Sequence, residues 1–452
     1  MTAATRIHDP RYEQASAEEI RALQLRRLRH LLRWTWSSNE FYRGQWARAA
    51  VDVERIDSLE AFAAQIPTVQ KADFIADQES DPPYGRRHAY ARGLGAPLIL
   101  MMTSGTSGQG QEIHLQTAAE MEITNGLYSF MFRWAGLLPG DALFLAMPIT
   151  MLAGGRGEYH GAVTYGLTTH AVGNYDAARK VELLRRFTPQ TILGNTSYLG
   201  RLATLLEGAP PPGLKCLISG GEGSGFEWLQ RLERAWGVPV FDRYGTTQMG
   251  TDHVFTCDQG IGSAERPGML HNLDHLFVTE VIDPDTGRQV RDGEEGEVVL
   301  TPLYRTDVPV VRCRVLDRAI YREARSCACG RPFGGIQIAS IARADDMKKV
   351  KGVNVWPQAV DDVLFARPEV QEYQVQLATA ANGGGDVATV RAMPRRPLSH
   401  PEQANLTATI SDTLRQRIGI RFEVELLEPG ALDQNEWKAR RWIDTRAHVR
   451  GT

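Results

Sequence analysis

The spacing of apolar residues near the N-terminus predicts an amphipathic helix. Between residues 17 and 48, leucine and isoleucine recur at helical spacing, at Ile20, Leu23, Leu25, Leu28, Leu31 and Leu32. One apolar stripe opposite a basic face is typical of a helix that packs on a core while its other side faces water. We therefore expect the first helix here, with a solvated basic face rather than a nucleic-acid site.

Short apolar runs then alternate with helical patterns. The runs predict strands at 97–105, 141–149, 190–196, 214–222 and 238–245, and the last two flank a helical pattern at 227–236. This alternation predicts βαβ units and a mostly parallel sheet.

The pattern changes after residue 275. Residues 276–303 alternate apolar and polar positions around an acidic turn that contains glycine, which predicts a small antiparallel region. Beyond Arg343 the chain resumes as a compact α/β segment with the size of a small domain. We expect two domains, at 1–344 and 345–452.

Composition narrows the class of protein. The 452 residues carry 51 Lys and Arg against 54 Asp and Glu, a net charge of -3, which offers no bulk field for nucleic acid or an anionic membrane. The polar N-terminus lacks the apolar region of a signal peptide, and no apolar run is long enough to span a bilayer. Five cysteines, an odd number, do not suggest a disulfide framework. We expect a cytoplasmic protein without a nucleic-acid or membrane partner.

The strongest local signal is a loop rich in glycine and hydroxyl groups. It begins after the first of the predicted strands and consists of Thr103, Ser104, Gly105, Thr106, Ser107 and Gly108. Backbone N–H and hydroxyl groups in such a loop can converge on phosphate oxygens because glycine lets the ligand approach closely. The loop lacks the Lys-Ser or Lys-Thr end of a Walker motif, and a flexible linker is the alternative.

Two further motifs follow buried strands, where open parallel sheets bind their ligands. They are Gly220, Gly221 and Glu222, and then Asp242, Arg243, Tyr244, Gly245, Thr246, Thr247 and Gln248. Tyr244 could lie against a purine, the two threonines could hold phosphate oxygens, and Gln248 could orient a water or bind a metal weakly. Each motif alone would also fit an ordinary strand-to-helix turn.

These motifs, in this order, resemble the adenylate-forming enzymes, and particularly the phenylacetate–CoA ligase-like branch. The likeness continues through residues 22–33, 39–43, 309–317 and 343–357 and Lys438, so it spans essentially the whole chain. It implies an α/β fold with a large N-terminal domain of mostly parallel sheets plus a small antiparallel region, and a small mobile C-terminal α/β domain.

The resemblance also implies an activity. Such enzymes join a carboxylic acid to AMP from ATP, with Mg²⁺ screening the charge, and most then pass the acyl group to coenzyme A. A different acceptor (an amine, a carrier-protein thiol or another small nucleophile) and a degenerate homologue that only binds nucleotide are the alternatives. Dimers are common in this branch, and the sequence leaves the oligomeric state open.

Roles in nucleotide binding follow from the resemblance. Residues 103–108 would cover the β- and γ-phosphates, while the 220–222 motif with Asp242 and Tyr244 would frame adenine. Asp317 would bind the ribose hydroxyls, and Arg343 would also face the nucleotide. Arg305-Thr306-Asp307 imitates the ribose motif, but the segment 309–312 before Arg314 matches the branch better.

Roles in the C-terminal segment follow in the same way. Asp345 would be the hinge of domain rotation. Lys351, Gly352 and Val353 would belong to the loop that lines the thiol tunnel. Lys438 would bridge the substrate carboxylate and the α-phosphate during adenylation.

Two departures from the family pattern concern charge. Gln248 stands where the family has a glutamate that helps hold Mg²⁺, so metal binding through this side chain should be weaker. The phosphate loop has Gln109 and Gln111 where a lysine is usual. Altered phosphate electrostatics and a drift in the chemistry are both consistent with these changes.

A metal site is also implied by the resemblance. The segment Cys327-Ala328-Cys329-Gly330-Arg331 is similar to one that this branch pairs with an upstream cysteine and histidine. Cys257 and His271 are the matching candidates for a structural Cys₃His zinc site. His253 competes for the fourth position, and four unlinked polar residues are the alternative.

The acid pocket is the least determined part. Segments 151–161 and 195–198 match branch segments that line it. Gly154 and Gly155 would let a flat ring lie against the backbone. Three aromatic side chains would stack on the ring or meet its substituents, and Glu158 would meet an amine or hydroxyl; the aromatic three are Tyr159, His160 and Tyr198. This favours an aryl or arylacetic acid.

Overall fold

The structure is a computed structural model and describes residues 6–103, 110–343, 347–351, 353–379, 386–432 and 441–446. The chain forms two compact units. Unit 1 comprises Met1–Gly194, Pro210–Gly221 and Val238–Ile341, and unit 2 comprises Asn195–Ala209, Glu222–Gly237 and Ala342–Thr452. The predicted domain boundary after residue 344 stays a prediction.

Unit 1 contains most of the helices and the large sheet. Its helices are α1 (Pro10–Glu13), α2 (Ala17–Ser38), α3 (Glu40–Arg48), α4 (Leu59–Gln65), α5 (Lys71–Ser80), α6 (Ala89–Gly93), α7 (Ala118–Trp134), α8 (Arg156–Tyr165) and α9 (Ala177–Phe187). Its strands are β1 (Val69–Gln70), β2 (Leu98–Met102), β3 (Ile113–Thr117), β4 (Ala142–Leu145), β5 (Thr168–Ala171), β6 (Thr191–Leu193), β7 (Cys216–Gly220), β8 (Val240–Thr246), β9 (Thr251–Thr256), β10 (Met269–Asn272), β11 (Phe277–Ile282), β12 (Glu295–Pro302), β13 (Cys313–Arg322) and β14 (Gly335–Gln337).

The large sheet of unit 1 is mixed, which corrects the expectation of mostly parallel sheets. Its strands run in the order β11-β12-β13-β14-β10-β9-β8-β7-β6-β4-β5. Strands β4 to β8 pair in parallel, as the strand–helix alternation predicts. From β8 through β9, β10, β14, β13 and β12 to β11 every pair is antiparallel. The antiparallel region therefore continues the sheet and is as extensive as the parallel part.

The first predicted strand does not join this sheet. Residues 98–102 form β2, which pairs antiparallel with β3 in a sheet of two strands. The apolar run predicts a strand correctly, but it carries no information about which strand becomes its partner. The segment between β2 and β3 contains the loop at 103–108.

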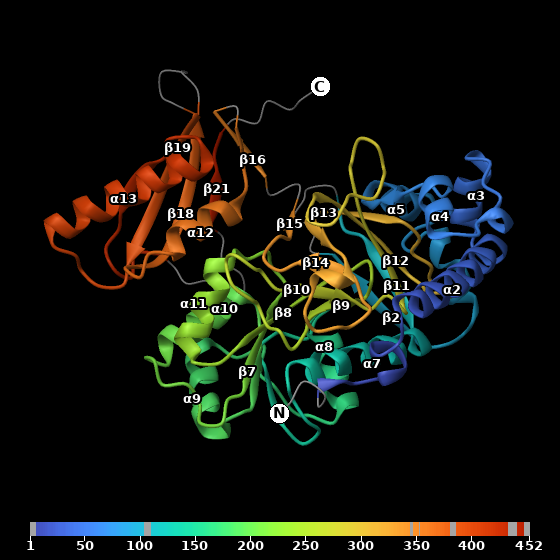
Figure 1. The fold of residues 1–452 in the computed structure, drawn as a ribbon, viewed down its shortest axis with the longest axis horizontal. Coiled ribbons are helices and arrows are strands. Elements are labelled where there is room, and N and C mark those ends of the chain that lie inside the picture. Colours follow the sequence, from blue (N-terminus) through green and yellow to red (C-terminus); the bar gives the residue numbers. More distant parts are fainter. Residues whose placement is uncertain are drawn as a thin grey trace. The chain divides into compact units, whose positions relative to one another are not determined.

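The N-terminal helical pattern is interrupted, so the expectation of one helix over 17–48 is wrong in length. Asn39 ends α2 and caps α3 by accepting a hydrogen bond from the Tyr42 amide. Its Nδ2 also donates to the Arg87 carbonyl, 2.9 Å away. Figure 1 shows α2 beside β11 and β12, and Gln24 of α2 donates to the Phe277 carbonyl of β11 at 2.7 Å. Ile20, Leu28, Leu31 and Leu32 of the predicted stripe are buried, whereas Leu23 and Leu25 are partly exposed.

Unit 2 combines two helices from the middle of the chain with the C-terminal segment. Its helices are α10 (Thr196–Leu205), α11 (Phe226–Trp236), α12 (Pro357–Phe365) and α13 (His400–Ile418). Its strands are β15 (Ala342–Arg343), β16 (Lys348–Val350), β17 (Val353–Val355), β18 (Val370–Thr379), β19 (Asp386–Pro394), β20 (Glu423–Leu426) and β21 (Trp442–Asp444). Strands β20-β19-β18-β21 form a sheet, with α12 and α13 against it (Figure 1).

The helices of unit 2 are joined by an aromatic contact. Trp228 of α11 lies 4.0 Å from Phe365 of α12 between ring centroids, and the Asp362 carboxylate accepts a hydrogen bond from the Glu227 amide at the start of α11.

None of the described helices has both the length and the apolar character that crossing a bilayer requires.

Candidate functional site

Two predicted nucleotide-binding residues meet in unit 1. Tyr244 lies in β8 and Asp317 in β13, and the Tyr244 hydroxyl donates to Asp317 Oδ2 at 2.6 Å. Asp242 and Tyr244 lie on one face of β8, because side chains alternate along a strand. Asp242 accepts a hydrogen bond from Ser219 at the end of β7, 2.8 Å away, and burial raises the pKa of Asp242 to about 6. Adjacent strand ends thus bring one motif of the sequence next to the other.

Gly220 is required where β7 passes β8. Its φ is +148°, and a Cβ there would lie 2.7 Å from both Cγ and the carbonyl oxygen of Arg243. A side chain at this position would push the two strands apart. The glycine of the first motif therefore has a structural role in bringing the strand ends together.

Arg243 points to the opposite face of β8 and is held by two carboxylates. Its guanidinium lies 2.8 Å from Glu158 and 2.6 Å from Asp252, and all three side chains are buried. Burial raises the pKa of Glu158 to about 7, even with Arg243 beside it. Glu158 is thus engaged by Arg243 rather than open to a substrate amine or hydroxyl, and the ion cluster locks α8 to β8 and β9.

Two hydrogen bonds join the ends of the predicted phosphate loop. The Thr103 amide donates to the Glu112 carbonyl at 3.0 Å, and the Glu112 amide donates to the Thr103 hydroxyl at 2.9 Å. The Glu112 carboxylate accepts from Gln248 Nε2 at 2.9 and 3.1 Å. Ser104, Gly105, Thr106, Ser107 and Gly108 lie outside the described residues. The structure therefore joins the base of this loop to the second strand-end motif.

The turn after β8 presents an unsatisfied hydroxyl. Thr246 Oγ1 is buried and has no hydrogen-bond partner within the described part of the chain, whereas its carbonyl accepts from the amides of Met249 and Gly250. An orphaned buried hydroxyl costs free energy unless a ligand or water satisfies it. Thr246, Gln248 and Thr103 are oxygen donors of the kind that accompany phosphate and Mg²⁺, so the donor set fits both.

The Arg305-Thr306-Asp307 segment, which is similar to the ribose motif, stabilises the fold. Arg305 is fully buried and donates to the carbonyls of Gln248 and Leu115. Asp307 accepts from the Thr117 hydroxyl at the start of α7, 2.8 Å away. These contacts stabilise the fold around the β8 turn, whereas Asp317 is the aspartate that faces Tyr244.

Predicted acid-pocket residues of unit 1 cluster on α8. His160 lines a small cavity with Met101 at the end of β2 and Gly250 after the β8 turn. The Tyr159 ring lies 5.5 Å from the His160 ring. Gly155, at a φ of +70°, leaves no room for a side chain, since a Cβ would lie 2.1 Å from the Pro148 carbonyl oxygen.

Gly154 and Tyr198 complete the acid-pocket predictions. A Cβ on Gly154 would lie 3.5 Å from the Glu158 carboxylate, so this glycine packs next to the ion cluster. Tyr198 is 4% exposed in α10 of unit 2. Unit 2 also contains the Glu222 carboxylate, which accepts from the Ser197 amide at the start of α10.

The remaining predictions fall in the C-terminal segment of unit 2. Arg343 is exposed at the end of β15. The Lys351 amide donates to Asp386 and its ammonium to the Arg421 carbonyl, each at 3.1 Å. Val353 begins β17. Asp345, Gly352 and Lys438 lie outside the described residues.

Cys257, His271, Cys327 and Cys329 converge in unit 1, and their ligand atoms all lie within 4.8 Å of one another. The Sγ atoms of Cys257 and Cys327 are 3.7 Å apart, and Cys329 Sγ is 3.4 Å from His271 Nε2. His271 Nδ1 lies 2.9 Å from the Phe333 carbonyl oxygen, which can only accept, so Nε2 carries the lone pair toward the sulfurs. The competing His253 instead stacks on Phe277 at 4.4 Å.

The spacing of this Cys₃His cluster fits a tetrahedral zinc ion. Zn–S bonds of about 2.3 Å and Zn–N bonds of about 2.0 Å give tetrahedral edges of about 3.8 Å for S···S and about 3.5 Å for S···N. The two distances in the cluster match both edges. The hydrogen bond from His271 to a backbone carbonyl is the outer contact that orients such ligands.

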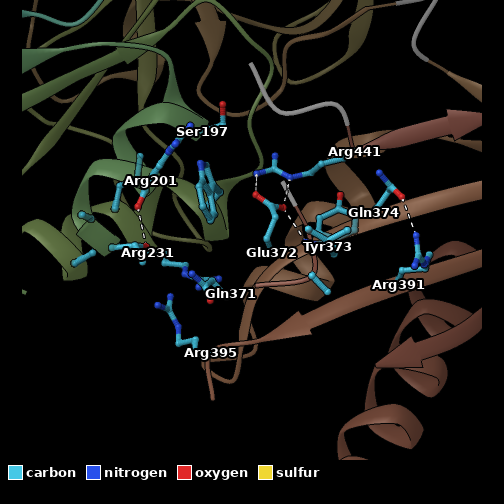
Figure 2. A pocket seen from close by; sticks show the side chains of 18 of the residues that line it. Ser197, Arg201, Arg231, Gln371, Glu372, Tyr373, Gln374, Arg391, Arg395 and Arg441 are labelled. Carbon is cyan, nitrogen blue, oxygen red and sulfur yellow. Dashed lines mark hydrogen bonds and ion pairs between the residues drawn. The ribbon is translucent and has the colours of Figure 1, made fainter. Parts of the chain in front are cut away.

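Unit 2 contains a cavity of about 770 Å³ between α10, α11 and the β18–β19 sheet. Its charged lining is formed by five arginines and two glutamates: Arg201, Arg231, Arg391, Arg395, Arg441, Glu207 and Glu372. Figure 2 shows Arg231 and Arg395 side by side at its wall, and Arg441 paired with Glu372. Burial, together with the nearby Arg395 and Arg441, lowers the pKa of Arg231 to about 9. With five arginines against two glutamates in its lining, the cavity is suited to an anion.

Sequence reasoning missed two features of these sites. Glu112 is an acid immediately after a loop without its usual lysine, and that position was a usable signal. The arginines of the cavity are scattered between residues 201 and 441 and share no motif, so only folding brings them together.

Two family models match this chain. The family described as AMP-binding enzyme matches residues 24–301, and the AMP-binding enzyme C-terminal domain matches residues 352–446. Phenylacetate-coenzyme A ligases from Aromatoleum evansii and Pseudomonas putida are each 29% identical, and both alignments cover 96% of this chain and 96% of the relative.

Solved structures agree with the sequence matches. A crystal structure of 2-hydroxyisobutyryl-CoA ligase in complex with 2-HIB-AMP is 26% identical, with a TM-score of 0.85 over 98% of this chain and 93% of that one. An O-succinylbenzoate coenzyme A synthetase from Bacillus subtilis, in complex with ATP and magnesium ion, shares the fold at 20% identity and a TM-score of 0.51 over 73% of this chain and 66% of that one. From its strand-end motifs to its C-terminal segment, the chain belongs to the AMP-binding enzyme family.

Proposed function

We propose that this protein is an AMP-forming acid–coenzyme A ligase that activates a small aromatic carboxylic acid. The observation that carries the proposal is the hydrogen bond between Tyr244 and Asp317, in a chain that aligns along almost its whole length with CoA ligases. Tyr244 and Asp317 lie 73 positions apart in sequence, and the fold brings them into contact at strand ends. A nucleotide bound there would need a ring beside its adenine and a carboxylate beside its ribose, and these two residues supply both.

The reaction has two steps. A carboxylate oxygen attacks the α-phosphorus of ATP, the bond to the bridging oxygen of the β-phosphate breaks, and pyrophosphate leaves. The thiolate of coenzyme A then attacks the acyl carbon, the bond to the AMP oxygen breaks, and AMP leaves. Bringing two anions together is the main difficulty of the first step, and cationic groups reduce it.

Each proposed role follows from the chemistry of the side chain. Asp317 accepts from the ribose hydroxyls, Thr103 and Thr246 donate to phosphate oxygens, and Lys438 stabilises the charge that develops at the α-phosphate. Mg²⁺, held near Gln248, would screen the phosphates. The Cys₃His cluster would hold a structural zinc ion away from the reaction.

The preference for an aromatic acid is supported by α8. His160 provides a flat ring at a cavity that also contains glycine backbone, and the Tyr159 ring lies 5.5 Å from the His160 ring. Such rings favour planar ligands over long flexible chains. The relatives that act on phenylacetate support the same class.

A panel of acids tests the activity. With ATP and Mg²⁺, we expect acid-dependent pyrophosphate release that is fastest with aryl or arylacetic acids, and mass spectrometry should detect their CoA thioesters. An amide or carrier-protein adduct in place of the thioester would show a different acceptor. If the protein binds ATP but releases no pyrophosphate with any of the acids, it is instead a degenerate nucleotide-binding homologue.

The arginine-lined cavity supports an acceptor that carries phosphates. Coenzyme A is such a thiol, and guanidinium groups bind phosphate oxygens through paired N–H donors. Arg231 and Arg395 both line the cavity, and they donate to the carbonyls of Val370 and Pro368 rather than to a carboxylate. An anion there would relieve their mutual repulsion.

Arg395→Ala is expected to raise the KM for coenzyme A about tenfold, equivalent to about 1.4 kcal/mol of lost binding. Pyrophosphate release in the absence of coenzyme A should stay unchanged. Steady-state kinetics at saturating ATP and acid measure both. Arg396→Ala is the matched control, because Arg396 is the next residue and pairs with Glu402 on the exposed surface. Equal KM values for the two variants would remove the cavity from the acceptor site.

A further inference from the structure

The contact between Gln248 and Glu112 fixes the orientation of the Gln248 amide. An ionised carboxylate only accepts hydrogen bonds, so the amide nitrogen must be the atom that faces Glu112, at 2.9 and 3.1 Å from its two oxygens. The amide is trigonal, and its carbonyl oxygen therefore points away from Glu112. Gln248 is only partly buried, whereas Glu112 is 1% exposed.

The His114 ring lies beside the Glu112 carboxylate. The Arg87 guanidinium donates to His114 Nδ1 at 3.0 Å, which leaves the proton of a neutral imidazole on Nε2. That atom lies 3.7 Å from a Glu112 oxygen. The buried Glu112 carboxylate thus has the Gln248 amide on one side and the His114 ring on the other.

The pair sits beside the groups proposed to meet the phosphates. The backbone of Glu112 is bonded in both directions to Thr103, and the buried hydroxyl of Thr246, two residues before Gln248, has no partner in the described chain. A fixed carbonyl oxygen with a negative charge directly behind it is a hard-cation donor. A free glutamine side chain would be a weaker one, because its amide could turn either end toward the cation.

We propose that Glu112 is a positioning residue that turns the Gln248 carbonyl oxygen toward the nucleotide's divalent cation and supplies the negative charge that a glutamine lacks. This inference rests on the proposed function, because it assumes that ATP binds at the β8 strand end. It predicts that the charge can be moved across the contact: a carboxylate at residue 248 with an amide at residue 112 should work as well as the native pair.

Mn²⁺ binding in the presence of ATP tests the proposal without turnover. Electron paramagnetic resonance on the full-length protein measures the affinity for Mn²⁺, and calorimetry measures the affinity for ATP. We expect Glu112→Gln to weaken Mn²⁺ binding 10- to 100-fold, the usual effect of removing a residue that orients a metal ligand. The double variant Glu112→Gln with Gln248→Glu should return to within about threefold of the native affinity, because it restores the negative charge of the pair.

Control variants distinguish misfolding, a wrong inference and a wrong proposed function. Glu79→Gln, an exposed acid on α5, should leave Mn²⁺ binding unchanged. If Glu112→Gln does not fold, Gln248→Ala leaves Glu112 in place and should show the same loss. Native Mn²⁺ affinity in a folded Glu112→Gln or Gln248→Ala variant, or a double variant no better than Glu112→Gln, overturns the inference. Absence of ATP binding by the native protein at any Mn²⁺ concentration would instead overturn the proposed function.

Discussion

Lys438→Ala is expected to lower acid-dependent pyrophosphate release by at least about 10²-fold, the scale on which removing one charge-stabilising donor acts. The lysine would lie between the substrate carboxylate and the α-phosphate, so its loss leaves two anions unscreened in the transition state. ATP binding should be largely intact. Pyrophosphate release at saturating ATP and acid, with ATP affinity from calorimetry, checks both statements.

The role assigned to Lys438 is confined to the first step. The variant should therefore still convert chemically prepared acyl-AMP and coenzyme A to the thioester at close to the native rate. Lys215→Ala is the control, because Lys215 pairs with Asp141 on the surface at 2.8 Å. Native rates of pyrophosphate release from Lys438→Ala would rule out its assignment.

His271→Ala is expected to remove zinc from the purified protein, which in its native form should contain about one zinc per chain. Three thiolates lose the fourth member of a closed tetrahedron, and the metal's binding free energy, which stabilises the folded state, is lost with it. We expect a fall of the melting temperature by at least about 5 °C. Elemental analysis and thermal unfolding measure the two effects.

His253→Ala is the matched control for this substitution. His253 is also a buried histidine, but it stacks on Phe277 outside the Cys₃His cluster. Its loss should lower stability through packing while zinc content stays near one per chain. Zinc loss from His253→Ala, or a native protein free of zinc with the same melting temperature after chelation, would contradict the cluster as a metal site.

The parallel half of the sheet could be predicted because its signal is local. Runs such as 190–196 and 214–222 are apolar strands between amphipathic helices, and short connections of this kind allow few arrangements other than a parallel sheet. The extent of the antiparallel half could not be predicted, because β9, β10 and β14 are short and their partner residues lie as far as 68 positions away in sequence. Strand pairing over such distances is decided by packing and leaves little trace in periodicity.

Side-chain direction separated residues that the sequence grouped together. Asp242, Arg243 and Tyr244 are consecutive, but the alternation along β8 sends Tyr244 toward Asp317 and Arg243 toward Glu158. The two arginine–aspartate motifs are separated in the same way. Asp307 accepts a hydrogen bond from the Thr117 hydroxyl at the start of α7, and Asp317 accepts one from Tyr244.

The order of its motifs by itself determined which family this chain belongs to and which residue types its chemistry uses, since both are carried by short segments that keep their identity wherever they fold. Only the tertiary structure decided which histidine joins the three cysteines, that Glu112 stands behind Gln248, and that distant arginines share one cavity. Those are distances between residues far apart along the chain, and such distances come into existence only when the core closes.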